Sequence, residues 1–245
     1  MKKVLFATAL LLVASPLLAD SFVNGGFEDG TFNGWVKDGG KYNGSYSPSG
    51  DQGKSAIVGL GTDPISGLNT VYNGNYSARV NNYDNGFHYS TITQTVLNWT
   101  DPNIYFAYAA VLEDPGHPNA GHMRVTLYDN NTATNLYDIY FDYYTAGTVM
   151  GGAWHTTHSA ITNTTWGYTD WQVVNLSVGA AVGHGLTLTL LASDCGWGGH
   201  GGYAYLDGFG AAPPPPSAVP EPTTVLLFGA GLAGLAAFGR RRNEK

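Results

Sequence analysis

The segments TITQTVL, residues 91–97, and IYFAYAAV, residues 104–111, decide the fold. Both are rich in Thr, Tyr, Val and Ile, and a short segment containing Asn, Asp and Pro separates them. β-Branched and aromatic residues bounded by turn-forming residues are typical of strands. The two segments therefore predict antiparallel β-structure.

Similar short runs recur along residues 20–210 between clusters of Gly, Asn and Asp, and no window shows a convincing amphipathic helix. This spacing is typical of a β-sandwich, and about 190 residues suffice for one substantial core. The expected strands are residues 34–36, 55–59, 76–80, 91–97, 104–111, 123–129, 136–143, 172–176, 186–192 and 204–209.

The first 19 residues have the layout of a secretory signal peptide. Lys2 and Lys3 provide the positive start, residues 4–14 form an apolar run, and Ala19 is the expected cleavage point. Leu17 is a weaker choice than Ala at its position, so a cut one or two residues away stays open. The sequence predicts an exported domain.

Residues 219–245 form a second special segment, VPEPTTVLLFGAGLAGLAAFGRRRNEK. As a helix, its apolar run 225–238 would rise about 20 Å, which is short of a bilayer core of about 30 Å. The three arginines that follow resist translocation and favour a cytoplasmic C-terminus. The alternative is a buried helix of a globular domain. Residues 211–222, with four consecutive prolines, predict a stiff spacer between domain and membrane.

This segment resembles a PEP-CTERM sorting signal. The matching parts are the motif Pro220, Glu221 and Pro222, the apolar helix, and the basic end Arg240, Arg241 and Arg242. The resemblance implies an exosortase that cleaves the tail near the motif, in a Gram-negative bacterium that makes exopolysaccharide. The protein would be held in the inner membrane before processing and then lie at the cell surface or in the extracellular matrix.

The domain is strongly acidic. Residues 20–210 carry 16 acidic and 5 basic side chains, a net charge of −11. Such a domain repels nucleic acid and anionic lipid, and it has carboxylates to spare for a divalent cation. Cys195 is the only cysteine, so an intramolecular disulfide is excluded.

Several short motifs resemble the galactose-binding-like jelly roll shared by many carbohydrate-binding modules. They are NGGFE at 24–28, GW at 34–35, GNYSARV at 74–80, ITQTV at 92–96, YFAY at 105–108, DWQ at 170–172 and YAYLDG at 203–208. The resemblance implies an all-β jelly-roll β-sandwich between the signal peptide and the C-terminal apolar helix. This fold hosts lectins, enzyme appendages and structural modules alike.

A structural calcium ion is the first site that this resemblance implies. In a jelly roll the first and last strands lie side by side, so Glu28 and Asp207 are expected to converge, with carbonyl groups near Gly26 and Tyr76 as further ligands. Ca²⁺ takes six to eight oxygen ligands of these kinds. The alternative is that Glu28 caps a turn while Asp207 accepts a hydrogen bond from neighbouring backbone.

A glycan-binding surface is the second expected site. Strand alternation over residues 136–144 places Tyr137, Ile139, Phe141 and Tyr143 in the core and the even-numbered residues from 138 to 144 on an outward face. Flat rings beside carboxylates suit a sugar ring and its hydroxyls, although tyrosines also decorate any solvent-facing sheet. The outward set is Asp138, Tyr140, Asp142 and Tyr144, with loop residues Trp154, Trp166 and Trp197 as additional candidates; Trp35 and Trp171 are expected inside.

Signals for catalysis are weak. His155 and His158 lack the helical setting of a zinc protease motif, and His117 and His122 are expected to be exposed. Cys195 lies in a glycine-rich loop without a spaced zinc pattern. We therefore expect no enzyme, but an exported, surface-sorted protein that binds extracellular polysaccharide. The alternatives are a structural matrix or adhesion protein that binds other proteins, and an unrecognised glycan hydrolase.

Overall fold

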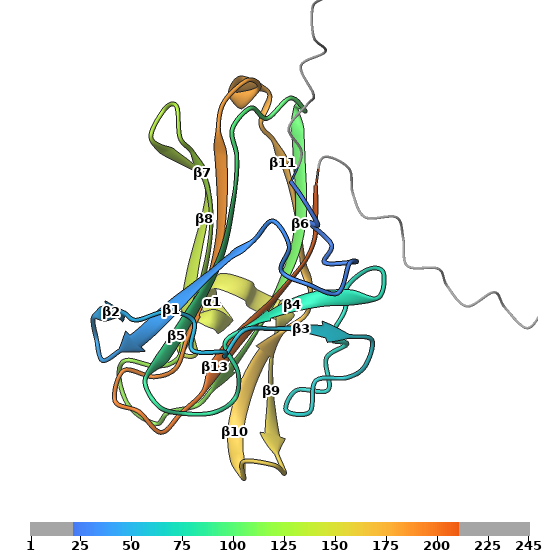
Figure 1. The fold of residues 1–245 in the computed structure, drawn as a ribbon. Helices are drawn as coiled ribbons and strands as arrows, with labels where there is room; N and C mark the ends of the chain where they lie inside the picture. Colours follow the sequence, from blue (N-terminus) through green and yellow to red (C-terminus); the bar gives the residue numbers. More distant parts are fainter. Residues whose placement is uncertain (1–21, 211–245) are drawn as a thin grey trace, which may run out of the picture.

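The computed structural model describes residues 22–210, which form a sandwich of two β-sheets (Figure 1). The strands are β1 (Val36–Tyr42), β2 (Tyr46–Pro48), β3 (Ala56–Gly59), β4 (Tyr76–Val80), β5 (His88–Val96), β6 (Asn103–Glu113), β7 (His122–Asp129), β8 (Thr134–Asp142), β9 (Trp154–Ser159), β10 (Thr164–Thr169), β11 (Gln172–Ser177), β12 (Leu186–Ser193) and β13 (Gly202–Gly210). The helical elements are α1 (Ala146–Met150) and the 3₁₀ turns Gly151–Ala153 and Gly179–Ala181.

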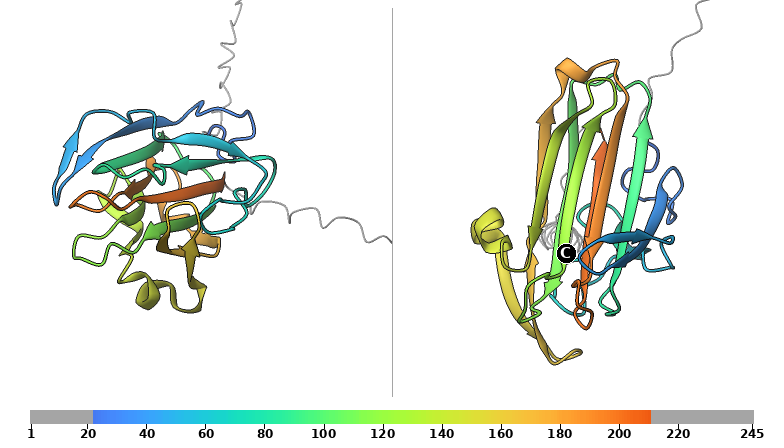
Figure 2. Two further views of the ribbon diagram at one scale, coloured as in Figure 1. Left: turned by 90° about the horizontal axis from the view of Figure 1, so that it is seen from below. Right: turned by 90° about the vertical axis from the view of Figure 1, so that its left-hand side faces the viewer.

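The six-stranded sheet has the order β2-β1-β5-β12-β7-β8, and the seven-stranded sheet has the order β3-β4-β13-β6-β10-β9, with β11 also paired to β6. Neighbouring strands are antiparallel, as in the central pair β5 and β12. The consecutive strands β4, β5, β6 and β7 alternate between the two sheets. The predicted all-β jelly-roll sandwich is therefore confirmed, and two further views show its layers (Figure 2).

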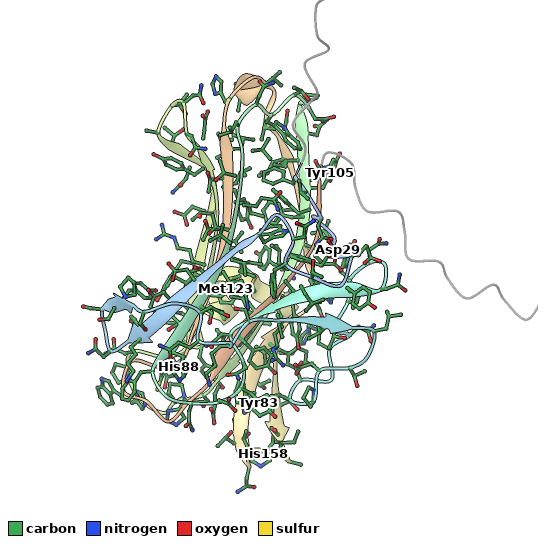
Figure 3. The ribbon with its side chains drawn as sticks, viewed as in Figure 1. Asp29, Tyr83, His88, Tyr105, Met123 and His158 are labelled. Carbon is green, nitrogen blue, oxygen red and sulfur yellow. The ribbon has the colours of Figure 1, made fainter. Side chains whose placement is uncertain are left out.

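The main core lies between the sheets and follows from the two-residue period of the strands. In β12, Leu186, Leu188 and Leu190 are fully buried, whereas Thr187 and Thr189 are partly exposed on the outward face. Met123 of β7 is buried in the same core (Figure 3). Each such side chain contributes about 1.5–3 kcal/mol when it leaves water, so this alternation fixes which face of the six-stranded sheet is outward.

A second apolar cluster lies on the opposite side of the seven-stranded sheet. Ile65, from the segment between β3 and β4, packs there with Trp166, Tyr203 and Tyr205. The buried carboxylate of Asp63 accepts hydrogen bonds from both tyrosine hydroxyls, at 2.6–3.0 Å. This segment thus covers part of the outer face of the seven-stranded sheet.

Three strands were not expected from the sequence: β2, β9 and β10. The strand expected at 34–36 begins only at Val36, as β1. Ala19, the linker 211–222 and the segment 219–245 with its sorting motif lie outside the described residues. Within residues 22–210, no helix has the length and apolar character needed to cross a membrane.

Candidate functional site

Five aromatic side chains gather on the outward face of the six-stranded sheet, and we call them the aromatic platform. They are Tyr42, Tyr46, Tyr89, His122 and Tyr140. Ring centroids lie 4.8 Å apart in the pairs Tyr42–His122 and Tyr46–Tyr89, 5.0 Å apart in Tyr42–Tyr46 and 5.4 Å apart in His122–Tyr140. Tyr46 and Tyr140 are each nearly half exposed, at 46% and 48%, so part of the cluster offers ring surface to solvent.

The hairpin of β1 and β2 positions the first two rings. Tyr42 and Tyr46 are paired across this hairpin, and their centroids lie 5.0 Å apart. Gly44, at the turn between them, has a φ of +95°, a conformation that favours glycine. The hairpin places Tyr46 above Tyr89 of β5, at a centroid distance of 4.8 Å.

His122 joins the two ends of the platform and is uncharged. It was expected to be exposed, but that expectation is wrong, because Tyr42 and Tyr46 pack against its ring and leave it 1% exposed. Burial lowers the pKa of His122 to about 4. In the neutral ring, an Nδ1–H that donates to the Ala120 carbonyl, 3.4 Å away, leaves Nε2 to accept the Tyr46 hydroxyl.

Tyr140 lies beside an oriented cation. Arg124 of β7 is paired with Tyr140 of β8, and its guanidinium donates two hydrogen bonds to Asp138, at 2.8 and 2.6 Å. Asp138 also accepts a bond from the Asn135 amide. The Asp138 carboxylate therefore holds Arg124 in place beside the Tyr140 ring. The sequence analysis did not identify Arg124 as part of this surface.

The other two members of the expected outward set have different surroundings. An Asp142 carboxylate oxygen accepts hydrogen bonds from the backbone of Tyr144 and Thr145, so it caps the turn after β8. Because β8 ends at Asp142, Tyr144 does not belong to the strand face, although it is 51% exposed. Asp142 and Tyr144 line an open depression together with residues 116–119.

The three tryptophans expected to bind a ligand, and the two expected inside, differ in their exposure to solvent. Trp166 is fully buried under the segment between β3 and β4, so its expected place in a ligand-binding loop is wrong. Trp154 lies in β9 and packs against Phe141 and the main core. Trp197 is 59% exposed. Trp35 is buried as expected, and Trp171 is only partly buried, against the second cluster.

Glu28 and Asp207 approach the same segment of backbone. The Glu28 carboxylate accepts bonds from the Asn75 and Tyr76 amides, and Asp207 accepts bonds from the Tyr72 and Asn73 amides. Burial raises the pKa of Asp207 to about 7, and the charge of Glu28 adds to the rise. Two close carboxylates match the donor chemistry of Ca²⁺, but each already serves the second role foreseen for it, as a backbone hydrogen-bond acceptor.

A family model supports the sorting assignment. Residues 218–242 match the PEP-CTERM protein-sorting motif, which indicates an exported protein that is anchored in a membrane before processing by an exosortase. No curated protein matches the chain.

Solved structures that resemble the chain share little sequence with it. TmCBM61 in complex with β-1,4-galactotriose has 12% identity and a TM-score of 0.43, covering 78% of this chain and 97% of its own. CBM27-1 of Caldicellulosiruptor saccharolyticus in complex with mannohexaose has 13% identity and a TM-score of 0.41, covering 77% and 95%. The K1 adhesin domain of Lys-gingipain from Porphyromonas gingivalis has 12% identity and a TM-score of 0.38, covering 76% and 94%.

Proposed function

We propose that the protein is an exported, non-catalytic binder of extracellular polysaccharide and that the aromatic platform is its binding surface. The observation that carries this proposal is the placement of the exposed rings of Tyr46 and Tyr140 on one open sheet face, next to Arg124. Aromatic rings stack on the apolar faces of sugars, and nearby donors and acceptors bind the hydroxyl groups.

The charge of the platform favours a neutral glycan. Burial raises the pKa of Tyr46 and of Tyr140 and lowers that of His122, so all three are uncharged at neutral pH. The domain around them is acidic, which disfavours an anionic polysaccharide. The ligand class is therefore a neutral polysaccharide, bound along the face of the six-stranded sheet.

Trp197 supplies a further exposed ring close to Tyr42 of the aromatic platform. Its neighbour Gly196 packs so closely that a Cβ there would lie 3.1 Å from the Tyr42 ring. The glycine-rich loop and the platform are thus in contact, and Trp197 extends the binding surface beyond Tyr42.

Binding to immobilised neutral and uronic-acid-rich polysaccharides tests the proposal. We expect the protein to bind the neutral set, and Tyr140→Ala to weaken binding at least about tenfold, or ~1.4 kcal/mol. Tyr105→Ala is the matched control, because it removes a tyrosine of β6 in the seven-stranded sheet (Figure 3). No binding to any glycan, together with binding to another matrix protein, would support the adhesion alternative; release of shorter sugars would support the hydrolase.

We also propose that Glu28 and Asp207 hold a structural calcium ion, with carbonyl oxygens near Gly26 and Tyr76. Calcium would offset the cost of the buried Asp207 carboxylate and tie the opening segment to β13. The melting temperature should then rise with calcium and fall with chelator, and Glu28→Gln and Asp207→Ala should lose this response. Asp63→Asn, which alters another buried carboxylate, should keep it. Indifference of the wild-type protein to chelator would exclude the ion.

The expected location is the cell surface or extracellular matrix of a Gram-negative bacterium. The sorting motif supports export and anchoring, and a matrix polysaccharide is the ligand that such a protein meets after processing. Replacing Pro220, Glu221 and Pro222 with alanine should keep the chain uncut in the membrane fraction. Unchanged release into the medium would contradict this route.

A further inference from the structure

The glycine-rich loop brings together three side chains that ligate metals. The Nε2 atom of His117 lies 3.2 Å from Nδ1 of His200, and the Cys195 sulfur lies 3.5 Å from the same Nδ1. All three ligand atoms lie within 4.8 Å of one another. His117 was expected to be an exposed loop residue, but it is half-buried against this loop.

The two short distances match the edges of a tetrahedral zinc site. Zinc binds nitrogen at about 2.0–2.1 Å and sulfur at about 2.3 Å, so tetrahedral angles separate two nitrogens by about 3.3 Å and a nitrogen from a sulfur by about 3.6 Å. Among residues 22–210 this is the one group of three such side chains. Two imidazoles and a thiolate suit a borderline-soft transition ion rather than calcium or magnesium.

The surroundings of His117 fix its ring so that Nε2 faces His200. Nδ1 of His117 lies 2.6 Å from the Pro118 carbonyl, so it carries the proton and leaves the Nε2 lone pair facing His200. Metal-bound imidazoles in proteins ordinarily make this kind of second bond. The indole of Trp197 stacks on the His117 ring at 4.4 Å with an interplanar angle of 16°, which restricts ring rotation.

The backbone of the loop holds the other two groups. The Cys195 amide donates to the His200 carbonyl at 3.0 Å, which closes the loop. The Gly196 amide donates to the Asn119 carbonyl at 2.8 Å, which joins the loop to the segment that carries His117. Asp194 takes no part, because its carboxylate accepts bonds from Asn81 and from the His88 amide.

We infer that His117, Cys195 and His200 bind one transition-metal ion of the zinc class. Cys195 is fully buried, whereas both histidines are partly exposed, so the ion can enter from the histidine side and keep a solvent ligand in its fourth position. The site would tie the loop carrying Trp197 to residues 117–119.

Cobalt(II) and zinc(II) titrations of the purified, reduced protein test this inference. The wild-type protein should give a thiolate-to-cobalt charge-transfer band and visible bands of tetrahedral intensity, and zinc should abolish both. The variants Cys195→Ser, His117→Ala and His200→Ala should each lose more zinc affinity than the roughly 10- to 100-fold that loss of an outer partner costs.

The control is His158→Ala, which removes an exposed imidazole of β9 that is not part of this cluster and should bind zinc as the wild-type protein does (Figure 3). The cobalt spectrum needs no substitution, so it decides the matter even where a variant fails to fold. Absence of the charge-transfer band from the wild-type protein would overturn the inference, as would zinc affinity that Cys195→Ser and His117→Ala leave unchanged.

Discussion

The hydroxyl oxygen of Tyr46 lies 2.5 Å from Nε2 of His122, although the two residues are 76 positions apart in the chain. Tyr46 begins the short β2 at one edge of the six-stranded sheet, while His122 begins β7 near the other edge. The hairpin of β1 and β2 therefore places Tyr46 over the sheet face, where it contacts both Tyr89 of β5 and His122 of β7. Its ring closes over Tyr89 and buries His122.

This burial predicts a pH dependence of stability. The folded-state pKa of His122, about 4, lies below its ordinary value of 6.5, so between these values the unfolded chain binds a proton that the folded protein does not. The contribution of the uncharged, buried His122 to the free energy of unfolding is fully present above pH 7 and is lost as pH falls from 6.5 to 4. The loss approaches about 3 kcal/mol when complete.

Urea unfolding at a series of pH values measures this effect. Tyr42 and Tyr46 face His122 from β1 and β2, and Tyr140 and Asp142 lie beside it from β8. His122→Gln should flatten the profile in this window, whereas His158→Gln should not. An identical slope in His122→Gln and the wild-type protein would show that His122 does not titrate as described.

Changing the ion pair of Arg124 and Asp138 should affect glycan affinity while leaving the free energy of unfolding almost unchanged. The pair is partly exposed, so its loss should change the unfolding free energy by less than about 1 kcal/mol. Arg124→Lys should nevertheless weaken glycan binding several-fold, because an ammonium cannot form the two-bond pair with Asp138 that fixes the guanidinium beside Tyr140. Calorimetric titration and urea unfolding of the same variant measure both quantities; unchanged glycan affinity would remove Arg124 from the site.

Asp63 predicts a large structural effect on the other side of the sandwich. Its buried carboxylate accepts bonds from Tyr203, Tyr205 and Ser66, so Asp63→Ala leaves three hydroxyl groups without their acceptor. We expect a loss of about 3 kcal/mol in unfolding free energy, against less than about 1 kcal/mol for the exposed control Asp84→Asn, which weakens only a surface ion pair with Lys54. Equal midpoints in urea would contradict the assigned network.

Gly167 lies so close to the Trp154 ring that a larger residue at this position should destabilise the protein. A Cβ at Gly167 would lie 1.9 Å from the Trp154 ring, whereas a Cβ at Gly152 would meet nothing within 4 Å. Gly167→Ala should therefore cost about 1–3 kcal/mol, and Gly152→Ala should cost far less. Thermal unfolding of the two variants compares them directly, and similar melting temperatures would refute the close packing.

Much of the fold could be predicted from the sequence because strand alternation is local. The outward position of Tyr140 and the buried position of Phe141 follow from that period alone. β2 was missed because it is three residues long and ends in proline. β10 contains three Thr residues, Trp166 and Tyr168, which favour a strand, but the sequence analysis places Trp166 in a loop because Gly, Thr and Asn surround it.

The candidate sites were less predictable because they depend on distant contacts. Trp166 of β10 is buried in one cluster with Tyr203 of β13 and Ile65 of the segment between β3 and β4, and no local pattern encodes that meeting of distant segments. Cys195 shows no zinc spacing in the sequence, because one of its neighbours in space, His117, comes from a distant loop. The sequence located the individual side chains, and the topology determined which of them meet.

The most direct test of the central proposal is calorimetric titration of the protein with neutral polysaccharides, comparing the double variant Tyr46→Ala and Tyr140→Ala with Tyr105→Ala. The aromatic platform predicts measurable binding by the wild-type protein and by Tyr105→Ala, and at least about a 100-fold loss, or ~2.7 kcal/mol, in the double variant. Equal affinity of all three proteins for the same glycan would contradict the assignment of this surface.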